Sequence, residues 1–525
     1  MEKLRTWMPF RRIIFILCFV AANLIEFTKA TQTGDVWYVT VNLTGLVIFS
    51  LIASTFSRTE IWNLRNLIWV AIGVLAAAGV WIFKNTSEIY IHLGRMESAV
   101  LNIPLLGIAA GVLWRRMRNN RGTRIAFSLR GILWISMMLL MIFSRNERMW
   151  PVWFLVMFGL FYLTDFQPED RKLMLEAMVD GTILSFFLFQ IFAYGARPFD
   201  TIRYVGFYNN PNTLGLYYLM IYMFVLIKLH LLHMKKAHFL WKLFYFIGAG
   251  GLLCFQIFTL CRTAWISSVI LTCFYGIVVL KYVRGEKIRM LLAKGVALAG
   301  MVAITFLPVF YSIRWLPTLT HYRVWYDGEY SLDKVHSFDP ADSDKYVELD
   351  EFMDAFVGRI IKTLISMNES NPLVLRAHAE ELENVDLVDV TWTGDESTKV
   401  RLTIYKTYLE RMRWFGNTTQ DGIFMIDDTY YCFHGQNIWI QMGFAFGIPV
   451  GILMILLTVV LFVYHGKKIK QDKDNPYAII PMMICIVFFS FGITEIVWLP
   501  GQLILFLMFF IQHPRLVYGL ECERG

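Results

Sequence analysis

The sequence predicts an all-α polytopic membrane protein with about 12–14 transmembrane helices and one large loop outside the membrane. Of the 525 residues, 57% are hydrophobic and only 17% are charged, whereas soluble proteins carry about 25% charged residues. Apolar segments of about 17–25 residues recur along nearly the whole chain, and each is long enough to cross a bilayer core of roughly 30 Å.

The apolar segments give the predicted spans one by one. In order they are 13–29, 37–56, 66–84, 98–114, 125–143, 150–164, 181–196, 213–232, 242–260, 264–281, 295–313, 438–464, 477–497 and 499–512. Residues 1–12 form a basic run that leads directly into the first span, without the pattern of a cleavable signal. We therefore expect the first helix to remain as an anchor.

The short connections between spans differ in charge, and this predicts the orientation of the chain. The strongly basic ones are 1–12, 115–124, 233–242, 281–294 and 465–476. Because Lys and Arg collect in cytoplasmic loops, both termini are expected in the cytoplasm. Arg203 and the long connection that follows the eleventh span are then expected outside.

The long connection, 314–436, is acidic, with 12 Lys and Arg against 22 Asp and Glu, so the remainder of the chain carries +18. The basic balance is a topology signal, and no nucleic-acid partner is predicted. The predicted parts are N-terminal transmembrane helices (1–180), core transmembrane helices with arginine motifs (181–313), an extracytoplasmic loop subdomain (314–436), C-terminal transmembrane helices (437–512) and a cytoplasmic tail (513–525).

Common signatures of cofactor and metal chemistry are absent from the sequence. The seven cysteines show no CxxC or Cys/His ligand spacing. There is also no Walker loop, GxSxG elbow or HExxH motif. We predict no metal site and no cofactor.

The stretch "RYVGFYNNPNTLG" places Arg203 and several Asn amides directly before the eighth span. Asn210 precedes a proline, and Asn212 can cap a helix that starts at Thr213. A helix N-terminus at a membrane surface is also a binding site for anions. A plain capped turn and an anion site are both compatible with this stretch.

Arg262 lies in the short gap between the ninth and tenth spans, so its guanidinium is expected at the same membrane boundary as Arg203. Alternatively, such arginines only anchor the helix ends, with their charged groups extended to the membrane surface. Arginines on a predicted outer face that is otherwise acidic favour an anionic partner, since guanidinium groups bind phosphate bidentately. Glu495, inside a predicted span, is expected to pair with an arginine, Arg262 being one candidate.

Two further elements close the long connection. Residues 401–416 are expected to form an amphipathic helix on the membrane surface, with its apolar face built from Leu402, Tyr405, Leu409 and Met412 and with Arg401 near the headgroups. The polar residues that then lead directly into the twelfth span are His434, Gln436 and Asn437.

Taken together, "RYVGFYNNPNTLG" (203–215), "LCRTAW" (260–265) and "HGQNIWIQMGFAFGIPVG" (434–451) resemble the O-antigen ligase / O-antigen polymerase superfamily. The similarity covers roughly residues 180–465 in order. Each motif alone is weak, and the set is moderately specific.

The resemblance implies a GT-C-like fold and a metal-independent glycosyltransferase of the bacterial cytoplasmic (inner) membrane. Its donor would be a polyprenyl-diphosphate-linked glycan, and its acceptor a glycan or lipid-linked hydroxyl at the outer face. By position, Arg203 and Arg262 would neutralise the diphosphate leaving group. Asn210, Asn212, Arg401, Gln436 and Asn437 would bind substrate.

The sequence departs from the family pattern at one position. The family usually has a histidine directly before the asparagine, where this chain has Gln436, and glutamine cannot act as a base. Either His434 takes the catalytic role, or the acceptor is activated otherwise and Gln436 only orients it. A flippase or secondary transporter of a lipid-linked glycan is the alternative function.

Overall fold

The computed structural model describes residues 8–28, 36–86, 93–119, 128–146, 150–194, 199–200, 203–206, 208, 210–316, 349–350, 352–358, 360, 394–419, 422, 424–426, 430–432, 434–495, 507–508, 510, 513 and 515–518. Most of the predicted loop subdomain, 314–436, and of the fourteenth predicted span, 499–512, lies outside these residues.

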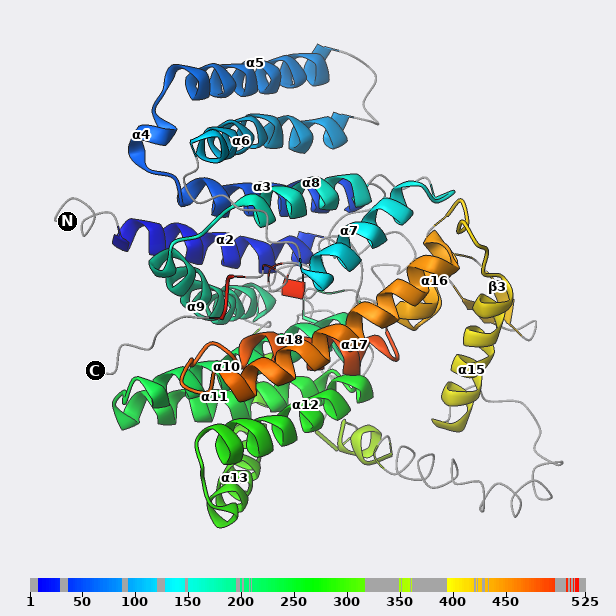
Figure 1. Ribbon diagram of the computed structural model, residues 1–525. Helices are drawn as coiled ribbons and strands as arrows, with labels where there is room; N and C mark the ends of the chain where they lie inside the picture. Colours follow the sequence, from blue (N-terminus) through cyan, green and yellow to red (C-terminus); the bar gives the residue numbers. More distant parts are fainter. Residues whose placement is uncertain are drawn as a thin grey trace.

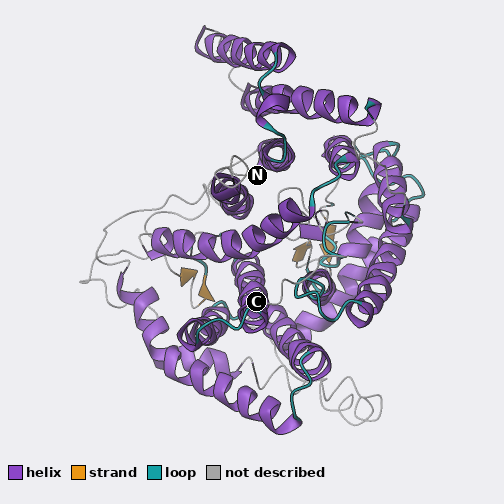
Figure 2. Cartoon of the chain, turned by 60° about the vertical axis from the view of Figure 1, so that its left-hand side comes forward, coloured by secondary structure: helices purple, strands orange, loops and turns teal. Residues whose placement is uncertain are grey.

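Within the described residues the chain forms helices and two pairs of short antiparallel strands (Figures 1 and 2). In chain order the elements are α2 (Met8–Thr28), α3 (Val36–Ser54), α4 (Arg58–Ile61), α5 (Leu64–Thr86), α6 (Leu93–Arg118), α7 (Leu129–Ile142), α8 (Trp150–Leu163), α9 (Pro168–Tyr194), β1 (Phe199–Asp200), β2 (Arg203–Tyr204), α10 (Pro211–Met234), α11 (Phe239–Phe258), α12 (Arg262–Phe274), the π-helix η2 (Tyr275–Val283), α13 (Ile288–Trp315), α15 (Gly394–Glu410), β3 (Phe424–Ile426), β4 (Tyr430–Cys432), α16 (Ile438–Phe446), α17 (Ile448–Gln471) and α18 (Ile480–Gly492).

Among the described residues, six helices are long and apolar enough to cross a membrane. They are α9, α10, α11, α12 continued by η2, α13 and α17. The shorter apolar helices are segments of α3, α5, α7 and α8, together with α18. The predicted class, an all-α protein with several membrane-spanning helices, is therefore confirmed.

Helix α10 lies at the centre of the bundle and contacts α9, α11, α12 and α18. Of its most apolar 18-residue window, 89% is buried inside the protein, whereas the corresponding value for α13 is 11%. A helix that is apolar on all sides must be surrounded by other helices or by lipid. Figure 1 accordingly shows α10 among its neighbours and α13 at the edge.

Three tyrosines of α10 carry hydroxyl groups into this apolar centre, and each has a partner on a neighbouring helix. Tyr218 donates to Oε1 of Gln190 at 2.9 Å, and the hydroxyl of Tyr222 lies 2.7 Å from that of Thr272. The Tyr217 hydroxyl lies 3.2 Å from that of Ser185. Because unpaired polar groups are costly in an apolar interior, these contacts fix α10 against α9 and α12.

The twelfth predicted span, 438–464, is wrong as a single helix. The structure has two helices there, α16 and α17, separated at Gly447. Gly447 has φ of 111°, a conformation that favours glycine, and a Cβ there would collide with the carbonyl oxygen of Trp414. The Arg413 carbonyl accepts a hydrogen bond from Ile448 N at 3.1 Å, so the segment after α15 is joined to this break.

At the end of the bundle where α10 finishes, basic side chains pair with carboxylates. The Asp180 carboxylate forms ion pairs with Arg12 at 3.1 Å and with Lys228 at 2.5 Å. Glu176 forms an ion pair with Lys235 at 2.6 Å. These pairs join α2, α9 and α10 where the predicted basic connections meet.

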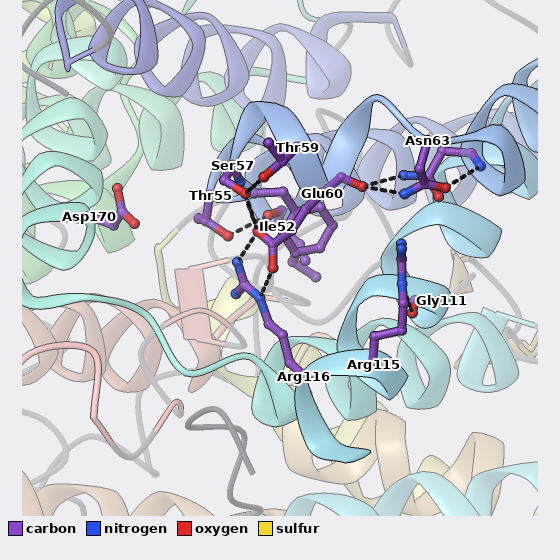
Figure 3. Close-up of polar contacts among 12 residues, drawn as sticks. Ile52, Thr55, Ser57, Thr59, Glu60, Asn63, Gly111, Arg115, Arg116 and Asp170 are labelled. Atoms are coloured by element: carbon purple, nitrogen blue, oxygen red, sulfur yellow. Dashed lines mark hydrogen bonds and ion pairs between the residues drawn. The ribbon is translucent and has the colours of Figure 1, made fainter. Parts of the chain in front are cut away.

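The same end contains Glu60 in α4, which Figure 3 shows beside Arg116 of α6. Arg116 donates to both Glu60 carboxylate oxygens, from Nε and Nη2, at 2.8 Å each. Glu60 Oε2 also accepts from Ser57 N at 2.9 Å and from the Ser57 hydroxyl at 3.0 Å. The Glu60 side chain thus reaches back to the Ser57 backbone N–H at the start of α4, which is one half of a capping box.

Candidate functional site

Arg203 is positioned by the short hairpin between α9 and α10. It is the first residue of β2, which pairs with β1 so that Arg203 stands opposite Asp200. Its Nε donates to the carbonyl of Thr259 at 3.0 Å, and its Nη2 donates to Oδ1 of Asn212 at 2.8 Å. The guanidinium therefore lies between the end of α11 and the start of α10.

Asn210, rather than Asn212, caps the helix that follows. Its side chain accepts from Asn212 N at 2.8 Å, and α10 begins at Pro211, where proline is favoured because no hydrogen-bond donor is needed. Asn212 is then free to use its side chain elsewhere: its Nδ2 donates to Oε1 of Glu495 at 2.9 Å. Asn212 is a bridge between Arg203 and Glu495.

Glu495 is the carboxylate at the centre of the cluster and follows the end of α18 by three residues. Besides Asn212 it contacts Arg401 of α15, with Nη2 3.7 Å from Oε1. The side chains of Arg401 and Glu495 are 28% and 15% exposed. The expected arginine partner of Glu495 is thus confirmed in the form of Arg401. Burial raises the pKa of Glu495 to about 7, although Arg401 and Arg203 oppose this shift.

The backbone before Glu495 is held by two side chains from the other side of the site. The carbonyl oxygen of Ile493 accepts from the Tyr405 hydroxyl at 2.8 Å and from Asn437 Nδ2 at 3.0 Å. The hydroxyl of Thr494 lies 2.7 Å from that of Thr263 in α12. Residues 493–495 therefore join α10, α12, α15 and the start of α16.

Helix α15 differs from its prediction in extent. It spans Gly394–Glu410, and its Leu402 and Leu409 are 61% and 53% exposed on the protein, so their predicted contact with the membrane surface stays a prediction. The fully buried positions are Ile404 and Tyr408, one turn apart, which pack against Phe444. This packing places Arg401, one turn before Tyr405, on the side that meets Glu495.

Gln436 and Asn437 connect α15 to the start of α16. Gln436 Oε1 accepts from Arg401 Nε at 3.2 Å, and the Gln436 carbonyl accepts from the Tyr405 hydroxyl at 3.3 Å. Its φ of 44° is unusual for a residue other than glycine, and such strain is concentrated at functional sites. Asn437 caps α16 by accepting from Trp439 N and Ile440 N.

Arg262 and His434 are neighbours of this cluster in the chain. Arg262 is the first residue of α12 and precedes Thr263, and His434 stands two residues before Gln436. Burial lowers the pKa of His434, because burial disfavours the charged form of the imidazole. Their predicted catalytic roles stay predictions.

The residues brought together are Arg203, Asn212, Arg401, Gln436 and Glu495, which we call the Arg203–Glu495 cluster. Arg401 contacts the Glu495 carboxylate directly and Arg203 is connected to it through Asn212, and both arginines are partly exposed. Such an arrangement can bind an anion through charge-assisted hydrogen bonds. Among the described residues, no three His, Cys, Asp or Glu side chains are grouped to hold a metal.

Tyr405, Thr263 and Thr494 also belong to the site, and the sequence did not single them out for it. The amphipathic pattern places Tyr405 only on an apolar face, because a tyrosine in such a pattern gives no sign that its hydroxyl has a specific partner.

No protein-family model, curated protein or solved structure has significant similarity to this chain.

Proposed function

We propose that the protein is a membrane glycosyltransferase that polymerises or ligates a polyprenyl-diphosphate-linked glycan at the outer face of the cytoplasmic membrane. The Arg203–Glu495 cluster would hold the diphosphate of the donor. Two observations support this proposal. The motifs resemble those of the superfamily, and residues from these motifs lie together in the cluster.

The observation that carries the proposal is the convergence of two arginines on one cluster. Arg203 and Arg401 are 198 residues apart in sequence, and both are connected to the carboxylate of Glu495, one through Asn212 and one directly. The Arg401–Glu495 distance of 3.7 Å is long for a hydrogen bond. Arg401 can therefore exchange this contact for one with a ligand phosphate while its Nε keeps the hydrogen bond to Gln436.

In the proposed reaction, an acceptor hydroxyl attacks the anomeric carbon of the donor glycan. The new carbon–oxygen bond forms as the bond from that carbon to the diphosphate oxygen breaks. His434 accepts the hydroxyl proton, and the negative charge of the departing diphosphate develops beside Arg203, Arg262 and Arg401. Stabilising charge where it develops is the main contribution expected of such groups.

A flippase or secondary transporter remains the second candidate, and one observation favours it. The break between α16 and α17 at Gly447 resembles the discontinuous helices that line transporter binding sites. The break lies close in sequence to Gln436 and Asn437, so it can serve either activity.

The test measures polyprenyl-diphosphate-linked glycans in cells that lack the protein, after re-expression of the wild type or of single variants. Arg203→Ala, Arg401→Ala, Arg262→Ala and His434→Ala are the informative variants. Arg413→Ala is the matched control, because Arg413 is exposed in the same region and lies outside the cluster. All variants are compared at equal amounts in the membrane.

Accumulated single repeats on the outer face, relieved by the wild type and by Arg413→Ala only, identify a polymerase. Long chains that never reach their acceptor identify a ligase. Accumulation on the cytoplasmic side points to a flippase, and an unchanged pool excludes every glycan function.

A further inference from the structure

A second site lies at the opposite end of the bundle, among α10, α11, η2 and α13. It is a cavity of about 490 Å³, within the range of roughly 300–1,000 Å³ that is usual for ligand sites. Its walls are mainly apolar and include Phe239, Leu243, Phe246, Leu280 and Leu298. Cys273 and Gly295 are exposed at its edge, so the cavity is open to the outside of the bundle.

Three cationic side chains line the same cavity: Lys242, Arg284 and Lys294. Glu286 is the carboxylate that pairs with two of them, Lys294 at 2.5 Å and Arg284 at 3.5 Å. Lys242 has no ion-pair or hydrogen-bond partner among the described residues. The lining thus carries more positive charge than its carboxylate neutralises.

The cavity exists because two helices do not close over it. The second half of the tenth span is the π-helix η2, whose wider turn is often found at functional sites. Helix α13 packs against α11 but is only 11% buried along its most apolar window. Gly276 of η2 and Gly295 of α13 face the cavity, and a Cβ added to either meets no atom within 4 Å.

We propose that this cavity binds an anionic phospholipid of the surrounding bilayer, with an acyl chain among the apolar walls and the phosphate beside Lys242, Arg284 and Lys294. An apolar cleft with a cationic edge matches an amphiphile that carries negative charge, and basic pockets between transmembrane helices bind such headgroups. The site is distinct from the Arg203–Glu495 cluster and does not depend on the proposed transferase activity.

The experiment measures lipid bound to the purified full-length protein by native mass spectrometry, with phosphatidylglycerol and phosphatidylcholine titrated separately. The wild type is expected to retain phosphatidylglycerol more tightly. Lys242→Gln removes one cation without breaking an ion pair, and it should weaken phosphatidylglycerol binding about fivefold while leaving phosphatidylcholine unchanged. Equal retention of the two lipids by the wild type would overturn the proposal.

A second pair of variants tests the position of the acyl chain. Gly295→Leu places a side chain in the open space of the cavity and should reduce bound phosphatidylglycerol at least tenfold. Gly300→Leu is the matched control, because Gly300 is on the same helix, has the same open space and lies outside the cavity lining. If Gly295→Leu binds lipid as Gly300→Leu does, the cavity is not the site.

Discussion

Glu60 and Glu495 are two carboxylates paired with arginine at opposite ends of the bundle, and their surroundings differ. Glu60 receives two hydrogen bonds from Arg116 at 2.8 Å and two from Ser57. Glu495 receives one hydrogen bond from Asn212 and one ion pair at 3.7 Å from Arg401. Glu60 therefore accepts four hydrogen bonds, whereas Glu495 has one hydrogen bond and one longer ion pair.

The pKa values of the two groups express the same difference. Burial raises the pKa of Glu60, but hydrogen bonds from Arg116 and Ser57 outweigh burial and lower the pKa to about 2. At Glu495 burial prevails and raises the pKa to about 7. Hydrogen bonds to the charged form therefore prevail at Glu60, and burial prevails at Glu495. Under the proposed function, Glu60 holds the fold together and Glu495 belongs to the binding site.

The largest expected effect is a difference in glycan transfer between variants at the two ends of the bundle. Arg203→Ala should slow glycan transfer about 100- to 1,000-fold, as expected when one group that stabilises developing charge is removed. Arg116→Ala should leave the rate per folded molecule within about twofold, because Arg116 serves only the fold. Transfer by the purified protein in proteoliposomes, corrected for the folded fraction, gives both values.

Arg203→Lys is a more specific test. Lysine keeps the positive charge, but it lacks the planar guanidinium that donates to both Thr259 and Asn212. The transfer rate of Arg203→Lys should therefore lie between those of Arg203→Ala and the wild type. Equal losses for Arg203→Ala and Arg116→Ala would remove the functional distinction between the ends.

The next effect is the pH dependence of stability at Glu495. The pKa of Glu495 is raised in the folded state. Its contribution to the free energy of unfolding is therefore fully present below about pH 4.5 and is lost as the pH rises through about 7. The stability of the wild type relative to Glu495→Gln should fall by about 3 kcal/mol over this window. Thermal unfolding in detergent at several pH values measures the difference. A relative stability that increases with pH would show that the arginines already satisfy this carboxylate.

Glu60 should show the opposite sign and a smaller change. Its pKa is lowered in the folded state, so its contribution is present above about pH 4.5 and is lost as the pH falls towards 2. At pH 7 the wild type should exceed Glu60→Gln by about 2 kcal/mol, after allowance for the partial exposure of the pair. The same unfolding assay applies, and a difference that persists unchanged to pH 2 contradicts the assignment.

The sequence predicts the helices well and their interruptions poorly. Apolar segments fix where a chain can cross a bilayer, so the predicted spans 213–232 and 242–260 agree with α10 and α11 to within a few residues. The break at Gly447 was missed because the segment around it stays apolar on both sides. Hydropathy records which residues avoid water, whereas this break depends on the close approach of the Trp414 carbonyl.

The site was predicted residue by residue but not as an arrangement. Arg203, Asn212 and Arg401 stand out in sequence because polar groups at a predicted membrane boundary need partners. Which partners they find depends on tertiary packing: Asn212 and Glu495 are 283 positions apart. The face of α15 that packs on the protein follows Ile404 and Tyr408, while Leu402 and Leu409 are exposed, and the amphipathic pattern alone does not distinguish a face that meets protein from one that meets a membrane.

The smallest expected effect tests whether Tyr405 positions Glu495. Tyr405→Phe removes the hydrogen bond to the Ile493 carbonyl and the longer contact to the Gln436 carbonyl, and Tyr408→Phe removes a hydrogen bond to the Gly422 carbonyl; the Ile493 and Gly422 bonds are both 2.8 Å long. Each should lower stability by about 1 kcal/mol, since both substitutions delete one hydroxyl from the same helix. Only Tyr405→Phe should also slow transfer, because its partner precedes Glu495 by two residues and fixes the carboxylate that Arg401 and Asn212 share. If both variants slow transfer equally, α15 acts as a whole and Tyr405 has no separate positioning role.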